Sequence, residues 1–339
     1  MRDETLVACR RLMADGSKSF SAASRLLPGR VAAPAAALYA FCRVADDAID
    51  LSYEPLQALA QLQRRLDAVY AGAPGPELAD QALAEVVERF DLPRPLLDAL
   101  LEGFAWDAEG RRYDTLEALH DYAARVAGGV GVMMAVLMET RDRTTLARAG
   151  ELGLAMQLTN IARDVGEDAR AGRLYLPREW MRHEGIDPAA WLREPRFDGA
   201  LARVVARLLA EADRLYARAE CGVAGLPRDC RAGIQAARLV YAAIGHQLAR
   251  DGLDSVSRRT VVPIRRKLAL MTRAAGAAVF APGHPMDIGL GHGPAPLPSI
   301  RFLVDAAADD RRPERTFYQR TVRVLELFER VDLRRRPAA

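Results

Sequence analysis

Apolar residues recur along this chain at intervals of three and four residues, the spacing that places them on one face of an α-helix. The period-two alternation that predicts strands is scarce. Turn signals rich in Pro and Gly separate the amphipathic stretches. We expect helices over 2–14, 34–50, 54–70, 77–90, 93–106, 115–131, 152–177, 197–222 and 229–250. The pattern predicts an all-α protein.

The composition favours one large helical domain. The 339 residues are 50% hydrophobic but only 6% aromatic, and their many Ala and Leu residues suit helix packing. Roughly the first 270 residues contain no linker-like break, whereas the region after them is rich in Pro and Gly. We therefore expect a catalytic domain at 1–275, a linker at 276–299 and a helical extension at 300–339.

Charge and hydropathy exclude two classes of partner or location. The net charge is +3, and the arginines are scattered rather than gathered in a stripe, so no nucleic-acid partner is expected. The first residues resemble no secretory signal, and the longest apolar run, 126–138, is too short to span a bilayer comfortably. A cytoplasmic protein is expected. In the segment 315–336, apolar residues among many Arg favour a weak contact with a membrane surface or partner, or else docking on the core.

One predicted helix carries a face of acids and amides. At about 100° per residue, five polar residues fall within an arc of roughly 100°. The residues of this face are Gln157, Asn160, Asp164, Glu167 and Asp168. Because the preceding stretch 152–161 is apolar enough to be buried, this face is expected to open into an enclosed space.

An earlier predicted helix carries a second face with acidic residues. Tyr39, Arg43, Asp46 and Asp50 lie within an arc of about 60° on the same projection, with Asp47 to one side. Two such faces turned toward each other could share hard divalent cations, which take oxygen ligands. The expected metal ligands are Asp46, Asp50, Asn160, Asp164 and Asp168. Without metal, the like charges would raise one another's pKa. A solvated surface is the alternative interpretation for either Asp pair alone.

Five segments, in this order and spacing, resemble the squalene/phytoene synthase family. They are ASRLLPGRV, ALYAFCRVADDAID, YAARVAGGVGVMM, QLTNIARDVGEDARAGRLYLP and GLDSVSRRTVVPIRRK. The resemblance extends from about residue 9 to about residue 270, and the fourth segment is its most specific part. It implies a single helical bundle of the class I isoprenoid synthase type with a central apolar cavity.

The resemblance also implies a prenyltransferase activity. Two geranylgeranyl diphosphate molecules would be joined head to head to give phytoene through a cyclopropyl (prephytoene) diphosphate, with Mg²⁺ or Mn²⁺ as cofactor and diphosphate as by-product. Small residues at Ser24 and Ala36 favour the twenty-carbon substrate. The alternatives are a synthase that makes dehydrosqualene or squalene from farnesyl diphosphate, a head-to-tail elongating synthase, and a non-catalytic relative. The pattern DVGED at 164–168 disfavours the head-to-tail alternative.

The site residues follow from the two helices and the resemblance together. Asp46, Asp50, Asp164 and Asp168 are expected to carry catalysis. The expected substrate contacts are Ser17, Ser19, Phe20, Tyr39, Arg43, Gln157, Asn160, Arg163, Arg173, Tyr241 and Arg259. Helix capping is an equal alternative for the two serines, and solvation is the alternative for Arg259.

The segment 126–131 combines three glycines with a departure from the family pattern. Glycine costs about 1 kcal/mol against alanine in a helix, so a helix or a substrate tail should approach closely here, and the resemblance favours the substrate. Relatives usually have a Tyr where this chain has Ala124, so its task would fall to another residue such as Tyr122.

Overall fold

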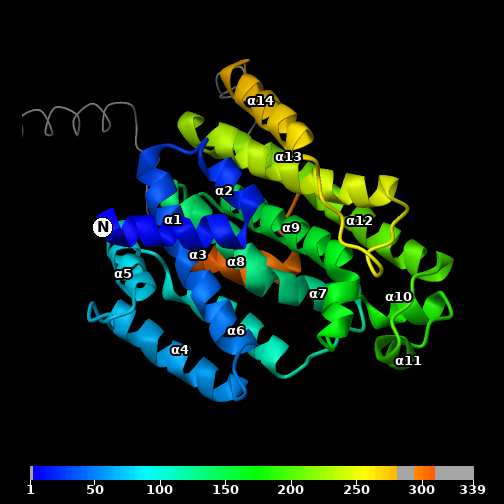
Figure 1. Ribbon diagram of the computed structural model, residues 1–339. Coiled ribbons are helices and arrows are strands. Elements are labelled where there is room, and N and C mark those ends of the chain that lie inside the picture. Colours follow the sequence, from blue (N-terminus) through cyan, green and yellow to red (C-terminus); the bar gives the residue numbers. More distant parts are fainter. Residues whose placement is uncertain (1–2, 281–293, 310–339) are drawn as a thin grey trace, which may run out of the picture. The chain divides into compact units, whose positions relative to one another are not determined.

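The structure, a computed structural model, describes residues 3–280 and 294–309 (Figure 1). Within these residues every regular element is a helix, so the all-α prediction is confirmed. The described residues up to Ala307 form one compact unit.

The helices alternate with short connections along the chain (Figure 1). The first nine elements are α1 Asp3–Gly16, α2 Lys18–Ser24, α3 Gly29–Asp50, α4 Pro55–Tyr70, α5 Leu78–Phe90, α6 Arg94–Ala108, α7 Leu116–Ala123, η1 Ala124–Gly128 and α8 Gly129–Leu137. The others are α9 Arg143–Arg170, α10 Arg178–His183, α11 Pro188–Arg193, α12 Gly199–Glu220, η2 Cys221–Gly225, α13 Arg228–Arg250, α14 Ile264–Phe280, η3 Pro298–Ile300 and α15 Arg301–Ala307.

The bundle is arranged around α9. Its first turn is capped by Asp142, whose carboxylate accepts a hydrogen bond from the backbone N–H of Thr145 at 3.0 Å. Leu146, Leu154 and Leu158 are fully buried on the faces of α9 that pack against other helices. The helices α8, α12 and α13 contact α9 directly and enclose it (Figure 1). The acidic residues near its end are thereby held by a buried scaffold.

Glycines let α8 and α9 cross at main-chain distance. A Cβ on Gly131 would lie 2.1 Å from the carbonyl oxygen of Ala149, and one on Gly153 would lie 2.2 Å from that of Ala127. Atoms cannot approach so closely, so both positions require glycine. The helix alternative therefore holds, and because Gly131 and Gly153 also line the cavity described below, close approach by the substrate stays a prediction. The predicted helix 115–131 is also interrupted by η1, a single π-helical turn.

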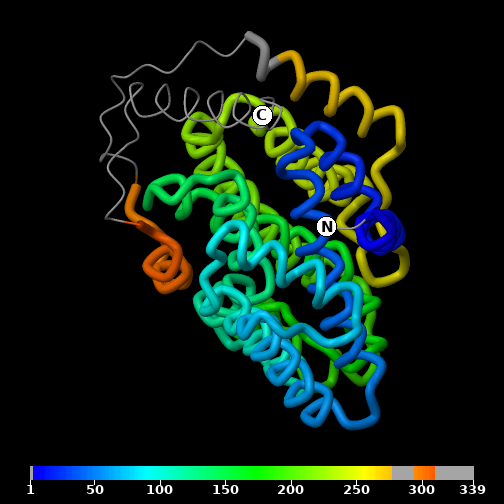
Figure 2. Tube along the Cα trace, turned by 90° about the vertical axis from the view of Figure 1, so that its left-hand side faces the viewer, coloured from blue at the N-terminus to red at the C-terminus, as the bar shows by residue number. Residues whose placement is uncertain are grey.

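The C-terminal boundaries differ from the predicted ones. Helix α14 continues through Phe280, into the predicted linker 276–299. Elements η3 and α15 (orange in Figure 2) return to the bundle, where α15 contacts α6, α8 and α9. The compact unit therefore includes the end of the predicted linker and the first residues of the predicted extension 300–339. The predicted helix at 315–336 lies outside the described residues.

Candidate active site

A long apolar cavity lies alongside α9. The family resemblance predicted such a central apolar cavity. Along α9 the lining positions recur every three or four residues, which places them on one face of the helix. They are Thr145, Arg148, Ala149, Leu152, Gly153, Met156, Gln157 and Asn160. The remaining wall comes from α2, α3, η1, α8, η2 and α13. Ala35 lines it from α3, whereas Ser24 and Ala36, from which the sequence argument for tail length was made, are not among the lining residues.

One end of this cavity is polar and aromatic. Gln157 and Asn160 reach it from α9, and Tyr241 reaches it from α13. The rings of Phe20 and Tyr39 stack there with their centroids 5.6 Å apart. The carbonyl oxygen of the Asn160 side chain is buried and has no hydrogen-bond donor within the described part of the chain. A buried acceptor of this kind is costly unless a ligand supplies the partner.

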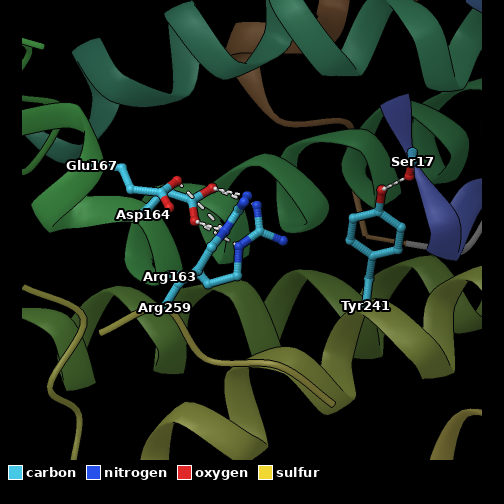
Figure 3. A network of polar contacts seen from close by, with 6 residues as sticks. All are labelled: Ser17, Arg163, Asp164, Glu167, Tyr241 and Arg259. Atoms are coloured by element: carbon cyan, nitrogen blue, oxygen red, sulfur yellow. Dashed lines mark hydrogen bonds and ion pairs between the residues drawn. The ribbon is translucent and has the colours of Figure 1, made fainter. Parts of the chain in front are cut away.

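Ser17 serves as a cap and also lies at this polar end. Its hydroxyl accepts a hydrogen bond from the backbone N–H of Phe20 at 3.2 Å, which confirms the capping alternative. The same hydroxyl lies 3.4 Å from the hydroxyl of Tyr241 (Figure 3). Ser19 lies in the first turn of α2, is partly exposed, and is not among the lining residues. The two serines therefore differ in their relation to the cavity.

The first acidic face is closed by an arginine of its own helix. Arg43 lies 3.4 Å from a carboxylate oxygen of Asp46 and 2.6 Å from one of Asp47. Burial, followed by the charge of Asp50, raises the pKa of Asp46 to about 6. The expected mutual repulsion is thus present, but loss of hydration is the larger cause.

The second acidic face is closed by two arginines. Arg163 and Arg259 donate to the carboxylate of Asp164, with Nε–Oδ1 distances of 2.7 and 2.9 Å (Figure 3). Arg259 also lies 3.5 Å from Glu167. Burial, followed by the charge of Asp164, raises the pKa of Asp168 to about 7. Asp168 is therefore the carboxyl that most needs a counter-charge on this face.

The two acidic faces meet. Arg173, which follows α9, donates to the Asp50 carboxylate at the end of α3, with an Nη1–Oδ2 distance of 3.2 Å. The charge of Asp107 on α6 contributes to the raised pKa of both Asp46 and Asp168. Residues separated by more than a hundred positions thus lie within electrostatic reach of one another. This geometry is consistent with the expectation that the two acidic faces are turned toward each other.

Sequence reasoning missed Asp107 and the tyrosines around it. Tyr122 and Tyr175 each donate a hydrogen bond to the Asp107 carboxylate at 2.7 Å. Their rings stack on each other, with centroids 5.1 Å apart, and Tyr113 stacks on Tyr175 and makes a tilted contact with Tyr122. Tyr122 was suggested to take over the task of the Tyr that relatives have where this chain has Ala124. Its hydroxyl is held by Asp107, whose charge reaches both Asp faces. Asp107 ends a stretch that reads as ordinary amphipathic scaffold, so it carries no local signal.

Gly166, inside the second acidic segment, admits a loop that carries Arg259. The backbone N–H of Gly166 donates to the carbonyl of Ser255 at 2.9 Å, and a Cβ on Gly166 would lie 2.3 Å from the carbonyl oxygen of Val256. Arg170 donates to that same carbonyl from the exposed side, at 3.3 Å. The glycine therefore positions the loop that brings Arg259 onto Asp164.

The donor set suits a hard divalent cation chemically. Carboxylates and an amide oxygen are the ligands that Mg²⁺ takes. The unpaired amide oxygen of Asn160 and the raised pKa values of Asp46 and Asp168 mark groups that a cation would satisfy. However, Asp50 and Asp164 are held by arginines, and nowhere in the described ranges do three His, Cys, Asp or Glu side chains converge as metal ligands do.

Comparisons with known proteins agree with this architecture. Residues 13–267 match the model of the squalene/phytoene synthase family. A phytoene synthase of Cereibacter sphaeroides is 52% identical over 96% of this chain and 94% of its own length. A phytoene synthase of Rhodobacter capsulatus is 53% identical over 91% of each chain. Among solved structures, a dehydrosqualene synthase in complex with a ligand has a TM-score of 0.73 and 31% identity, covering 80% of this chain and 96% of its own.

The fold is therefore a helical bundle of the class I isoprenoid synthase type, with an apolar cavity whose polar end lies one helical turn before Asp46 on α3 and Asp164 on α9. The chain belongs to the squalene/phytoene synthase family.

Proposed function

We propose that this chain is a prenyltransferase that joins two geranylgeranyl diphosphate molecules head to head to give phytoene in carotenoid biosynthesis. The observation that carries the proposal is an apolar cavity whose lining residues Cys42 and Asn160 lie one helical turn before the arginine-paired carboxylates of Asp46 and Asp164. The similarity to phytoene synthases over almost the whole chain supports the choice of product.

Two ionisations make up the proposed reaction. In the first, one diphosphate leaves and the resulting allylic cation is attacked by the double bond of the second molecule, which gives a cyclopropylcarbinyl diphosphate and releases a proton. In the second, that diphosphate leaves, the carbon skeleton rearranges, and proton loss gives phytoene. The released diphosphates are the bases that take the two protons.

The charged residues of this chain would hold the leaving group. Arg43, Arg163, Arg173 and Arg259 already lie at the acidic faces, where each could turn a guanidinium group to phosphate oxygens. Asp46, Asp50, Asn160, Asp164 and Asp168 would bind Mg²⁺ or Mn²⁺. A divalent cation bound there neutralises charge that develops on the departing diphosphate.

The cavity would protect the cation from water. Its wall is apolar over most of its length, and the rings of Phe20, Tyr39 and Tyr241 lie at the end where charge develops. Aromatic faces stabilise cations by about 0.5–2 kcal/mol. Exclusion of water prevents the cation from being captured as an alcohol.

Product analysis tests the proposal directly. The purified protein is incubated with Mg²⁺ and either farnesyl or geranylgeranyl diphosphate, and the products are identified by mass spectrometry. Phytoene from the twenty-carbon substrate is expected. Dehydrosqualene or squalene as the main product would replace the proposal with a fifteen-carbon synthase, and a requirement for isopentenyl diphosphate would indicate head-to-tail elongation.

We also infer a peripheral contact with an anionic membrane surface. No described helix is long and apolar enough to cross a bilayer. The start of α14, however, exposes Ile264 and Leu268 to 68% and 55%, beside the exposed Arg265. An exposed face that combines apolar and basic residues suits anionic lipid.

Vesicle flotation distinguishes binding through this surface of α14 from non-specific binding through any exposed apolar residue. Ile264→Asp with Leu268→Asp should reduce binding to anionic vesicles, whereas Leu56→Asp, at an equally exposed position on α4, should leave it unchanged. A truncation before residue 310 tests the predicted tail contact separately. Equal binding by all of these proteins would contradict both contacts.

A further inference from the structure

The cavity has two chemically different ends. Its lining face on α9 extends from Asn160 to Thr145, a rise of about 22 Å at 1.5 Å per residue. Asn160 lies at the acidic end. At the other end lie Thr145, Arg148, Val223 and Leu226, which we call the cavity floor. A tail whose diphosphate is held at the acidic end would reach this floor with its last carbons.

A buried ion cluster forms part of the floor. Arg148 lies 2.7 Å from one carboxylate oxygen of Glu151, and Arg218 lies 2.6 Å from the other. The side chains of Arg148 and Glu151 are only 3% and 0% exposed. Two guanidinium groups share one carboxylate, so the cluster keeps a net positive charge in a buried place. Such a cluster is stable only if further acceptors satisfy its N–H groups.

The chain after residue 293 supplies two such acceptors, while Nε of Arg148 and Nε of Arg218 have no hydrogen-bond partner within the described residues. The carbonyl of Pro294 accepts a hydrogen bond from Nη2 of Arg148, and the carbonyl of Ala295 accepts one from Nη2 of Arg218 at 2.8 Å. This segment lies outside residues 13–267, which match the family model. The floor of the cavity is therefore completed by a part of the chain that the family match does not include.

Apolar anchors hold the segment in place. Ile300, Leu303 and Val304 are fully buried. Ile300 lies over Gly150: a Cβ on that glycine would be 3.3 Å from Cδ1 of Ile300. Leu303 lies over Gly128, where a Cβ would be 3.5 Å from Cδ1 of Leu303. The docking of 298–307 on α9 and η1 thus keeps the carbonyls of Pro294 and Ala295 at the ion cluster.

The side of the floor formed by η2 has no spare room. A Cβ on Gly222 would lie 2.2 Å from Cβ of Arg148, and a Cβ on Gly225 would lie 2.2 Å from the hydroxyl oxygen of Thr145. A hydrocarbon end therefore cannot pass between η2 and α9 unless one of them moves. It could advance only by displacing the charged side chains themselves.

We propose that residues 294–307, acting through Arg148, Glu151 and Arg218, set the longest prenyl tail that this cavity accepts. The inference rests on the proposed function, which places the tail in the cavity. A tail longer than the cavity would have to replace the ion pairs and hydrogen bonds of two buried guanidinium groups with apolar contacts, which is unfavourable. A tail that ends at the floor leaves them intact.

Two variants move the floor in opposite directions. The combined change Arg148→Met, Glu151→Leu and Arg218→Met replaces the charges with flexible apolar side chains, an exchange that buried ion clusters tolerate. It should raise kcat/KM for a twenty-five-carbon diphosphate relative to the twenty-carbon one by at least tenfold. Val223→Phe fills the floor and should lower kcat/KM for the twenty-carbon diphosphate relative to the fifteen-carbon one by at least tenfold.

Controls separate the floor from general damage. Val7→Phe makes the same change of size at an exposed position on α1 and should leave both ratios unchanged. Ile300→Asp with Leu303→Asp releases the segment and should shift the ratios as the combined variant does. Thermal stabilisation by unreactive thiolodiphosphates with fifteen, twenty and twenty-five carbons reports tail binding without turnover, and the order of stabilisation should follow the same shifts.

The outcomes for the floor and for the proposed function are distinct. If the wild-type protein converts none of the allylic diphosphates, the proposed function fails. If it converts the twenty-carbon substrate, and both the combined variant and Val223→Phe keep the wild-type ratios, the floor inference alone is overturned. Should the combined variant not fold, as judged by circular dichroism, Val223→Phe decides the question.

Discussion

Replacing Gly166 by alanine tests how the second acidic face is assembled. The added Cβ would lie 2.3 Å from the carbonyl oxygen of Val256 and 2.7 Å from its Cα atom. Both are backbone atoms, so the loop must move away rather than rotate a side chain. We expect the hydrogen bond from Gly166 to Ser255 to break and Arg259 to withdraw from Asp164.

The size of the effect follows from three contributions. Loss of the hydrogen bond costs about 0.5–1.5 kcal/mol, and crowding in a packed site costs about 1–3 kcal/mol. Alanine is more favourable than glycine in a helix, which offsets about 1 kcal/mol. The net loss of about 0.5–3.5 kcal/mol should lower the melting temperature by about 1–5 °C, because an unfolding entropy of about 2.1 cal/mol/K per residue gives roughly 0.7 kcal/mol per degree for 339 residues. Withdrawal of one charge-assisted contact of about 1.5 kcal/mol should raise KM about tenfold.

Differential scanning calorimetry and steady-state kinetics measure the two effects. Gly276→Ala in α14 is a matched control, since no atom lies within 4 Å of its Cβ position, and it should be neutral or slightly stabilising. If Gly166→Ala were as stable as the wild-type protein and had an unchanged KM, the assigned role of Gly166 would be refuted. A stability loss without a KM change would refute only the role of Arg259 in binding diphosphate.

The remaining predictions concern the acidic faces and the helix crossing. Because the pKa of Asp168 is raised to about 7, ionising it costs folding stability in the metal-free protein. Asp168→Asn should therefore raise the melting temperature most at pH 8, less at pH 5, and hardly at all below about pH 4, where the carboxyl is protonated in the unfolded chain as well; the opposite pH dependence would contradict the assigned burial. Asp46→Asn and Asp164→Asn should each abolish turnover without loss of helical circular dichroism, and near-normal turnover in either would refute the metal assignment. Gly153→Ala should lower the free energy of unfolding by about 2–3 kcal/mol in urea titrations, because its Cβ would meet the main chain of Ala127; an unchanged midpoint would show that the helices can separate without cost.

Much of the helical architecture was predictable because it depends on local periodicity. The apolar spacing in α4, α5 and α12 is enough to place each helix and its buried face. The two acidic faces were predictable for the same reason, since helical geometry alone brings Asp46 close to Asp50. Local pattern does not show what lies opposite such a face. The expectation that the two acidic faces lie opposite each other came from the family resemblance.

What the sequence could not reveal depends on contacts between distant segments. Asp107 ends an ordinary amphipathic helix and becomes distinctive only when Tyr122 and Tyr175 donate to it. Arg148 and Arg218 likewise donate to the backbone carbonyls of Pro294 and Ala295, which lie 146 and 77 positions further along the chain, and no spacing rule reaches such partners. The glycines at 128, 129 and 131 could be recognised as a sign of close approach, but not assigned to a partner, and Gly153 on the facing helix gave no signal of its own.

The main-chain contact between α8 and α9 also constrains how this cavity can evolve. Where Gly131 meets Ala149, the separation of the two walls is already the smallest that peptide groups permit, so no smaller residue exists to widen the chamber there. Adaptation to a different hydrocarbon must therefore come from other surfaces, such as Ala35 and Leu38 on α3 or Val223 in η2. A mutational library aimed at new products should therefore vary those positions and leave the contact between α8 and α9 unchanged.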